Sequence, residues 1–213
     1  MRPTISWRMA PRPGIDRRSI VAEAARLADE RGIANVTFAN VAQRVGVRAP
    51  SLYNHIESVE ALHHELAVTG LRALADALAR AAIGRNGAAG VTAIGGAYRA
   101  FAKEHPGLYA ATVRAADPGD AELQRIALEM METMRAVLAP FALDEKHVTN
   151  ALRAFRSLVH GFTSLEVAGG FGFPQSVDDS FEWALAAYVA ALQTGVPGSA
   201  GARARTRAVG AAR

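Results

Sequence analysis

Apolar residues recur along most of this chain at intervals of three and four positions, the spacing that places them on one face of an α-helix. No alternating strand pattern and no internal repeat is found in the sequence. The pattern therefore predicts an all-α fold of about nine helices. Two short helices are predicted within residues 37–56, and the others span 16–32, 58–83, 91–104, 108–115, 121–139, 144–167 and 176–193.

The stretch from Thr37 to Ile56 predicts two short helices joined by a tight turn. The first carries an apolar stripe of Phe38, Val41, Ala42 and Val45. Gly46 should end it, because glycine adopts left-handed backbone angles without steric cost. Pro50 is tolerated only in the first turn of a helix, so the second helix should begin at Arg48 or Ala49. This arrangement is typical of proteins that lay the second helix in a DNA major groove.

The same stretch closely resembles the DNA-binding segment of the tetracycline-repressor (TetR) family of bacterial transcriptional regulators. The residues that carry the resemblance are Thr37, Val41-Ala42-Gln43-Arg44-Val45-Gly46-Val47, Ser51-Leu52-Tyr53 and Ile56, with Ile20 to Leu27, Gly32 and Glu60-Ala61-Leu62 around them. The resemblance implies a three-helix DNA-binding domain over residues 16–57. It also implies a helical ligand-binding and dimerisation domain over residues 58–194.

Residues 158–162 and 169–171 also resemble a C-terminal domain subtype that is named for a Trp-His-Gly motif. Val159 stands in the place of the tryptophan. Outside the two domains, residues 1–15 contain three prolines and three arginines and are predicted to form a flexible basic arm. Residues 195–213, which are rich in Gly, Ala and Arg, are predicted to be disordered.

The family resemblance implies contacts with a double-stranded DNA operator by Thr37, Arg48, Ala49, Ser51, Tyr53, Asn54 and His55. The Thr37 hydroxyl can cap the first helix and also face a phosphate. The guanidinium of Arg48 can pair with guanine O6 and N7, or it can be a solvated surface group. Tyr53 can donate to a phosphate or serve only in packing, His55 could be simply a surface residue, and Leu52 should pack inward.

Composition and charge agree with this interpretation. The chain has 213 residues, is 50% hydrophobic and 21% charged, and contains no cysteine, which excludes disulfides and thiolate chemistry. The net charge is +4, with a basic excess in residues 1–64 and a mildly acidic body after them. A basic front fits a segment that meets phosphate. No apolar run is long enough for a membrane span, so we expect a cytoplasmic, nucleoid-associated protein without a membrane partner.

One departure from the family pattern concerns the start of the helix that follows the motif. Val59 stands where family members often have a phosphate-binding lysine. The arginines of the arm, Arg2, Arg8 and Arg12, could replace that contact in a minor groove, or the arm could be a solubilising tail.

The resemblance further implies a homodimer built on the last two helices and released from DNA by a small molecule. Apolar residues on those helices could form the interface, although some could face the protomer's own core: Val159, Phe162, Phe181, Leu185, Tyr188 and Leu192. An apolar or aromatic effector would suit a pocket lined by Tyr98, Phe101, Tyr109, Met130, Met134, Phe155 and Trp183, any of which could instead be plain core. His105, Arg156 and His160 are options for its polar anchor.

Other classes of function find little support in the sequence. No nucleophile motif, zinc-protease motif or phosphate loop is present, so we expect neither an enzyme nor a cofactor. Neighbouring His63 and His64 point in different directions on a helix and cannot share a metal. The remaining alternative is a helical protein-interaction adaptor that has lost DNA binding.

The expected mechanism of the regulator is a tilt of its long fourth helix. This tilt would change the spacing of the two recognition helices of the dimer, which should lie about 34 Å apart on DNA.

Overall fold

The computed structural model describes residues 15–113 and 117–194, and all regular structure in these ranges is helical. The elements are α1 Arg17–Arg31, η1 Ile33–Asn35, α2 Phe38–Val45, η2 Ala49–Asn54, α3 Val59–Ala82, α4 Gly87–Glu104, α5 Pro106–Ala111, α6 Ala121–Leu138, η3 Ala139–Phe141, α7 Glu145–Val167 and α8 Val177–Thr194. Eight α-helices, with η2 as a ninth, confirm the all-α prediction for the described part of the chain. The predicted arm and tail, residues 1–14 and 195–213, lie outside it.

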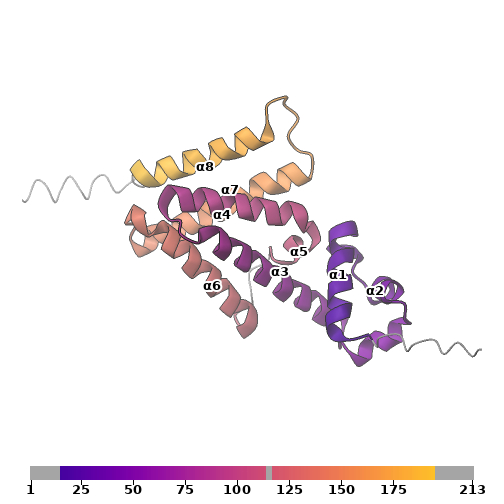
Figure 1. Ribbon diagram of the computed structural model, residues 1–213. Helices are drawn as coiled ribbons and strands as arrows, with labels where there is room; N and C mark the ends of the chain where they lie inside the picture. Colours follow the sequence, from indigo (N-terminus) through magenta and orange to yellow (C-terminus); the bar gives the residue numbers. More distant parts are fainter. Residues whose placement is uncertain (1–14, 114–116, 195–213) are drawn as a thin grey trace, which may run out of the picture.

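The three N-terminal helical segments form one end of the molecule (Figure 1). Asp16 caps α1 by accepting from the Ser19 N–H at 2.7 Å, and the Ser19 hydroxyl returns a bond to the Asp16 backbone. Gly46 ends α2 with φ 75° and ψ 33°, the left-handed conformation predicted for it. These local signals set the limits of the motif before any packing is considered.

The second helix of the motif differs from expectation in its geometry. η2 is a six-residue 3₁₀ helix rather than a run of α-helix. Pro50 lies in its first turn, and the Ser51 N–H donates to the Arg48 carbonyl at 2.9 Å, an i to i+3 bond. Because Pro50 has no N–H and the segment ends at His55, too few residues remain for a regular α-helical ladder.

α3 connects the two ends of the molecule. Its 24 residues span about 36 Å at 1.5 Å per residue. Figure 1 shows it running from beside α1 into the C-terminal bundle, where it packs against α4, α5 and α6. Ser58 caps it by accepting from the Ala61 N–H at 3.1 Å, as predicted. Leu62, Leu66, Leu74 and Leu78 are buried along it, so one continuous core extends through both ends of the molecule.

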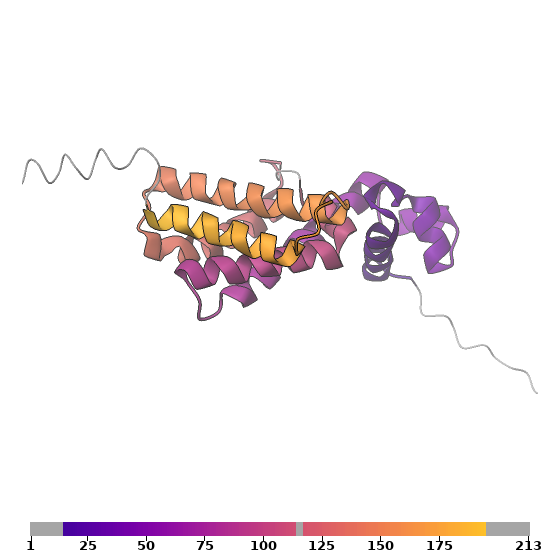
Figure 2. The same cartoon turned by 90° about the horizontal axis from the view of Figure 1, so that it is seen from above.

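The C-terminal helices α4 to α8 form the larger part of the molecule, and α7 and α8 lie side by side on one flank (Figure 2). Arg99 of α4 ties this flank together, because it pairs with Glu166 of α7 at 2.6 Å and with Asp178 of α8 at 2.7 Å. Gly95 brings α4 and α8 close, since a methyl group there would lie 2.7 Å from the Leu185 side chain. None of the described helices has the length and apolarity needed to cross a membrane.

Two predicted boundaries were wrong. Residues 85–90 were expected to form a loop, but α4 begins at Gly87 after the cap residue Asn86. The short helix expected over 108–115 is α5, which begins at Pro106 and ends at Ala111. In both cases a glycine or proline occupies the first turn of the helix, where these residues disturb few hydrogen bonds.

Candidate DNA-binding surface, dimer surface and ligand cavity

The motif presents a polar surface on a buried apolar support. Leu52, at the centre of η2, is fully buried together with Val41 of α2, as expected. Thr37, Arg48, Tyr53 and Asn54 are exposed, whereas Ala49, Ser51 and His55 are half-buried. Six of the seven predicted DNA-contact residues therefore lie on η2 or its cap positions, which the buried Leu52 holds against the core, and Thr37 lies at the start of α2.

Two of these side chains have a structural contact in addition to an exposed polar atom. The Thr37 hydroxyl oxygen accepts from the Asn40 N–H at 3.2 Å and so caps α2. The Tyr53 ring packs edge-on against Phe38 with the ring centroids 4.8 Å apart, although 60% of Tyr53 is exposed. The ring is thereby held in place while the hydroxyl group is free to meet a partner outside the protein.

The two arginines of the motif differ in their partners: Arg44 is paired with acidic residues of α1, whereas Arg48 is not. Arg44 donates to Glu30 at 2.5 and 2.9 Å and to Glu23 at 3.3 Å, which fastens α2 to α1. These contacts raise the pKa of Arg44 and lower that of Glu30. Arg48 has no carboxylate within ion-pair distance among the described residues. Its positive charge is therefore uncompensated at the start of η2.

Sequence reasoning did not single out Arg18, which lies at the start of α1 in the same N-terminal end of the molecule. The pKa of the cap residue Asp16 is lowered mainly by hydrogen bonds from Ser19, and the positive charge of Arg18 adds to the effect. Arg18 is exposed and, within the described residues, has no ion-pair partner. Its position one residue after the helix start was the only signal in the sequence.

α5 is clamped to the DNA-binding end of the molecule. One carboxylate oxygen of Asp29, in α1, accepts from the N–H groups of Gly107 at 2.9 Å and Leu108 at 3.0 Å. The other oxygen lies 3.1 Å from Nδ1 of His105. The backbones are so close that a methyl group on Gly107 would lie 2.0 Å from the Ala28 carbonyl carbon. Only glycine permits this approach.

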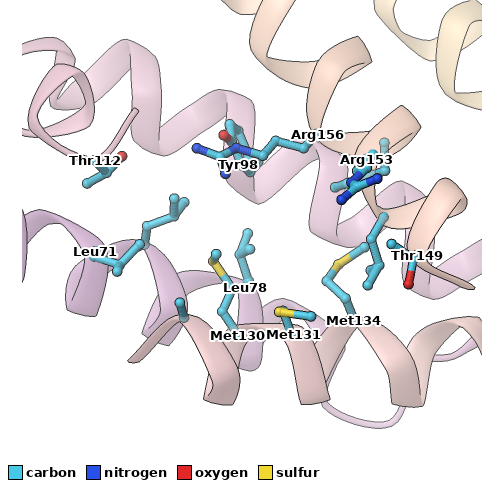
Figure 3. A pocket seen from close by; sticks show the side chains of 14 residues that line it. Leu71, Leu78, Tyr98, Thr112, Met130, Met131, Met134, Thr149, Arg153 and Arg156 are labelled. Atoms are coloured by element: carbon cyan, nitrogen blue, oxygen red, sulfur yellow. The ribbon is translucent and has the colours of Figure 1, made fainter. Parts of the chain in front are cut away.

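A cavity of about 370 Å³ lies between α3, α4, α6 and α7 (Figure 3). Its apolar walls come from α3, α6 and α7, and they comprise Leu71, Leu74, Leu78, Ala127, Met130, Met131, Met134, Leu152 and Phe155. Its polar lining consists of Tyr98, Thr112, Thr149, Arg153 and Arg156. Figure 3 shows the methionines on the α6 side and the two arginines on the α7 side.

Four of the seven predicted pocket residues line this cavity: Tyr98, Met130, Met134 and Phe155. The other three do not. Trp183 is 74% exposed on the outside of α8, and Phe101 is buried beside the His105 ring. Tyr109 lies behind Tyr98, with their hydroxyl oxygens 3.2 Å apart. Aromatic residues were selected by type, but the face of the helix decides which of them reach the cavity.

Of the three options for a polar anchor, only Arg156 lines the cavity. His105 is bound to Asp29, as described above, and His160 accepts or donates a hydrogen bond at the Tyr109 hydroxyl. Burial and the bond to Tyr98 raise the pKa of Tyr109, so its phenol stays neutral at ordinary pH. Arg156 donates from Nη2 to the Val113 carbonyl at 2.8 Å.

The residues predicted for the dimer interface belong mainly to the core of a single chain. Val159, Phe181, Leu185, Tyr188 and Leu192 are all buried, and Phe162 packs against Phe171 and Phe181. The Tyr188 hydroxyl donates to the Ala151 carbonyl at 2.8 Å, which joins α8 to α7. The apolar stripes therefore face neighbouring helices of the same chain.

Small residues recur among the exposed positions of α7 and α8. On α8 the exposed residues include Ala186, Ala187, Ala190 and Ala191, beside Asp178, Asp179, Ser180, Glu182, Trp183, Gln193 and Thr194. On α7 they include Ala154, Ser157 and Ser164, with the half-buried Gly161 between them. A methyl group on Gly161 would meet nothing within 4 Å. Small side chains in register allow two helices to approach closely.

Both the N-terminal and the C-terminal part of the chain match models of known protein families. Residues 20–66 match the model of bacterial regulatory proteins of the tetR family, and residues 91–188 match that of the tetracyclin repressor-like C-terminal domain. The HTH-type transcriptional regulator YobS of Bacillus subtilis is 33% identical over 184 residues, which are 86% of this chain and 96% of YobS.

Solved structures share the fold. A protein from Rhodococcus sp. RHA1 has a TM-score of 0.73 and 22% identity, over 87% of this chain and 99% of its own. TetR-Q116A from Acinetobacter baumannii AYE, solved in complex with minocycline, has a TM-score of 0.61 and 21% identity, over 85% of this chain and 98% of its own.

Proposed function

The chain belongs to the tetracycline-repressor (TetR) family of bacterial transcriptional regulators, and from this premise we propose that it is a ligand-responsive repressor. It binds a palindromic operator as a homodimer, and a small molecule that enters the cavity releases it. Proteins of this family bind DNA and are not enzymes. The observation that carries the proposal is the pairing of an exposed DNA-binding segment with an apolar cavity at the two ends of α3.

Arg48 is the proposed base-reading residue, because its guanidinium has no acidic partner among the described residues and stands at the start of η2. Thr37, Tyr53 and Asn54 contact phosphates with their exposed polar atoms, and Ala49, Ser51 and His55 complete the surface. Arg18 adds a phosphate contact near the start of α1. It could supply a positive charge that Val59 cannot.

Two physical connections lead from the cavity to this surface. Leu71, Leu74 and Leu78 of α3 line the cavity, and the same helix begins at the DNA-binding domain. Thr112, just after α5, also lines it, and the start of α5 is clamped to Asp29 of α1. A ligand that fits one arrangement of α3 and α5 better than the other shifts the spacing of the recognition segments, whereas equal affinity for both arrangements shifts nothing.

The dimer forms through the outer faces of α7 and α8, where the small residues described above leave room for a second copy. Family regulators bind DNA as dimers, and α7 and α8 lie side by side along one flank of the molecule (Figure 2). Four helices, two from each chain, would then pack around a two-fold axis. In this proposal the protein acts in the cytoplasm, where it binds its operator.

The first experiment is binding of the purified protein to genomic fragments across a salt series. We expect saturable binding to a few palindromic sites. The binding should weaken steeply with salt, because it releases counterions from the DNA and this release is less favourable at high salt. The double variant Arg48→Ala, Tyr53→Phe should weaken operator binding about tenfold or more. Arg80→Gln removes one exposed charge from α3 outside the motif and serves as the matched control.

The outcomes separate the repressor from the adaptor. Loss of operator binding in the double variant, with an intact fold and dimer, supports the repressor. Unchanged operator binding would refute the assignment of the DNA surface. Weak and equal binding to every fragment, even after removal of co-purified small molecules, would favour a helical adaptor.

A further inference from the structure

We propose that the cavity takes an apolar organic acid, whose anionic group is held by Arg153 and Arg156. The inference deepens the proposed function and rests on it in one respect, namely that the cavity is the effector site. It changes the expected effector from a plain apolar or aromatic molecule to one with an apolar body and a single negative charge. The charged groups that line the cavity carry the argument.

The charged side chains that line the cavity are positive. Arg153 and Arg156 are its two charged residues, and no aspartate or glutamate lies among the described residues that line it. They are three positions apart on α7, so they project from the same face of the helix. Figure 3 shows both guanidinium groups on the side of the cavity opposite the methionines. The electrostatic potential of the cavity mouth is therefore positive.

Both guanidinium groups have donors to spare. Two other arginines show what pairing with an acid looks like: Arg44 is held by Glu30, and Arg135 is held by Glu145 at 2.9 and 3.0 Å. Neither Arg153 nor Arg156 is within ion-pair distance of a carboxylate in the described part of the chain. Arg156 uses Nη2 on the Val113 carbonyl at 2.8 Å, and an arginine has five N–H donors in all.

The contact with Val113 has a second effect. It fixes the Arg156 guanidinium against the segment that follows α5, next to the cavity lining residue Thr112. Arg153 lies one turn earlier on α7 and is exposed. In the proposed complex a planar anionic group accepts from one or both guanidinium groups, whose forks match carboxylate oxygens in geometry.

The rest of the lining determines the size and polarity of the uncharged part of the ligand. Leucine and methionine side chains form the walls, and few polar atoms interrupt them. A cavity of about 150 Å³ holds a benzene molecule, so 370 Å³ has room for a larger body such as a fused ring pair or a medium-length alkyl chain. Methionines on one wall let the cavity adjust to either shape. Sugars and other strongly polar bodies would leave their hydroxyl groups unpaired.

A cationic effector is disfavoured by the same residues. Proteins that bind quaternary ammonium groups surround them with aromatic faces. Here the aromatic lining is limited to Tyr98 and Phe155, and the Tyr98 hydroxyl is already bonded to Tyr109. Two arginines would repel a cation, and no acid in the lining would compensate it.

The test uses three probes that share one alkyl chain and differ in charge: decanoate, 1-decanol and decyltrimethylammonium. Each is titrated into the full-length protein by calorimetry. We expect decanoate to bind about tenfold more tightly than the other two, with the difference shrinking as salt is added. Arg153→Gln and Arg156→Gln should each weaken decanoate about threefold, and the double variant should bring it to the level of decanol.

The matched control is Arg80→Gln, which removes the same charge from an exposed position that does not line the cavity. It should leave all three affinities unchanged, and decanol should bind equally to every variant. Both arginines on α7 are exposed, so their variants should keep the melting temperature of the parent protein.

Equal affinity for the three probes, a preference for decanol or the cation, no binding of decanoate, or an equal loss in Arg80→Gln would each overturn the inference. Operator release measured with the same probes separates it from the proposed function. Release by decanol as well as by decanoate would keep the effector site and reject the anionic selectivity. Arginine-dependent decanoate binding without any change in operator affinity would support the acid site and reject the ligand response.

Discussion

Gly107 is the position where a single methyl group should reveal how strongly α5 holds the DNA-binding end of the molecule. A Cβ atom built there would lie 2.0 Å from the carbonyl carbon of Ala28, 2.1 Å from its oxygen and 2.5 Å from the Asp29 nitrogen. Favourable contacts between carbon atoms are about 3.5–4.0 Å long. Gly107→Ala must therefore push α5 and α1 apart by roughly 1.5 Å.

That displacement acts on the Asp29 clamp directly. The bonds from Asp29 to the N–H groups of Gly107 and Leu108 are 2.9 and 3.0 Å long and cannot survive such a shift unchanged. Overpacking costs about 1–3 kcal/mol, and a hydrogen bond to a charged group is worth about 1.5–3 kcal/mol. Alanine regains somewhat less than about 1 kcal/mol of helix propensity. We expect a net loss of about 2–4 kcal/mol in the free energy of unfolding.

The measurement is urea unfolding followed by circular dichroism, at one fixed protein concentration because dimerisation contributes to stability. Gly96→Ala is the matched control, since Gly96 lies inside α4 and a methyl group there meets nothing within 4 Å. It should stabilise the protein by about 0.5–1 kcal/mol. If Gly107→Ala were as stable as Gly96→Ala, the close approach of α5 and α1 would be refuted, together with its role in coupling.

Three further predictions concern other parts of the structure. Arg99 and Lys103 lower the pKa of Glu166 from 4.5 to about 2, so its ion pairs stabilise the fold fully above pH 4.5 and are lost as the pH falls toward 2. Glu166→Gln should remove on the order of 2–3 kcal/mol of that acid-dependent stability, measured by unfolding from pH 7 to pH 2. Thr163→Val should raise the unfolding free energy by about 1 kcal/mol in the same assay, because the buried Thr163 hydroxyl has no hydrogen-bond partner among the described residues; a loss would mean that the hydroxyl is bonded. Ala187→Arg, on the exposed face of α8, should convert the dimer to a folded monomer in sedimentation, and an unchanged mass would place the interface elsewhere.

Most helix limits could be predicted because the signals that set them are local. Asp16, Ser58 and Asp144 each accept from a backbone N–H three residues on, as expected from a cap followed by an apolar stripe. The start of α4 could not be predicted in this way. Gly87 and Gly90 look like loop residues, yet a methyl group on Gly90 would lie 2.8 Å from Val137, so tertiary packing explains its presence in a helix.

The cavity was predicted in part, and its errors follow from helix geometry. Met130, Met134, Tyr98 and Phe155, which were predicted by residue type, do line it. Trp183 stands two positions from both Phe181 and Leu185, which are buried. At about 100° per residue it must point roughly opposite to them. The sequence therefore contained the signal against Trp183, whereas the position of the exposed Arg153 at the cavity lining depends on how α7 packs against its neighbouring helices.

Most of the residues that were predicted for the dimer interface from their apolar stripe are buried within a single chain. Periodicity identifies the face of a helix that meets its nearest neighbours, and for α8 those neighbours are α4 and α7 of the same chain. Phe181, Leu185 and Tyr188 are buried in that core. The face that remains is rich in alanine, which raises no hydrophobic periodicity signal but lets a partner helix come close. A second copy should therefore be sought where the side chains are smallest, and an arginine at position 187 is a severe test because it fills the space that close helix packing requires.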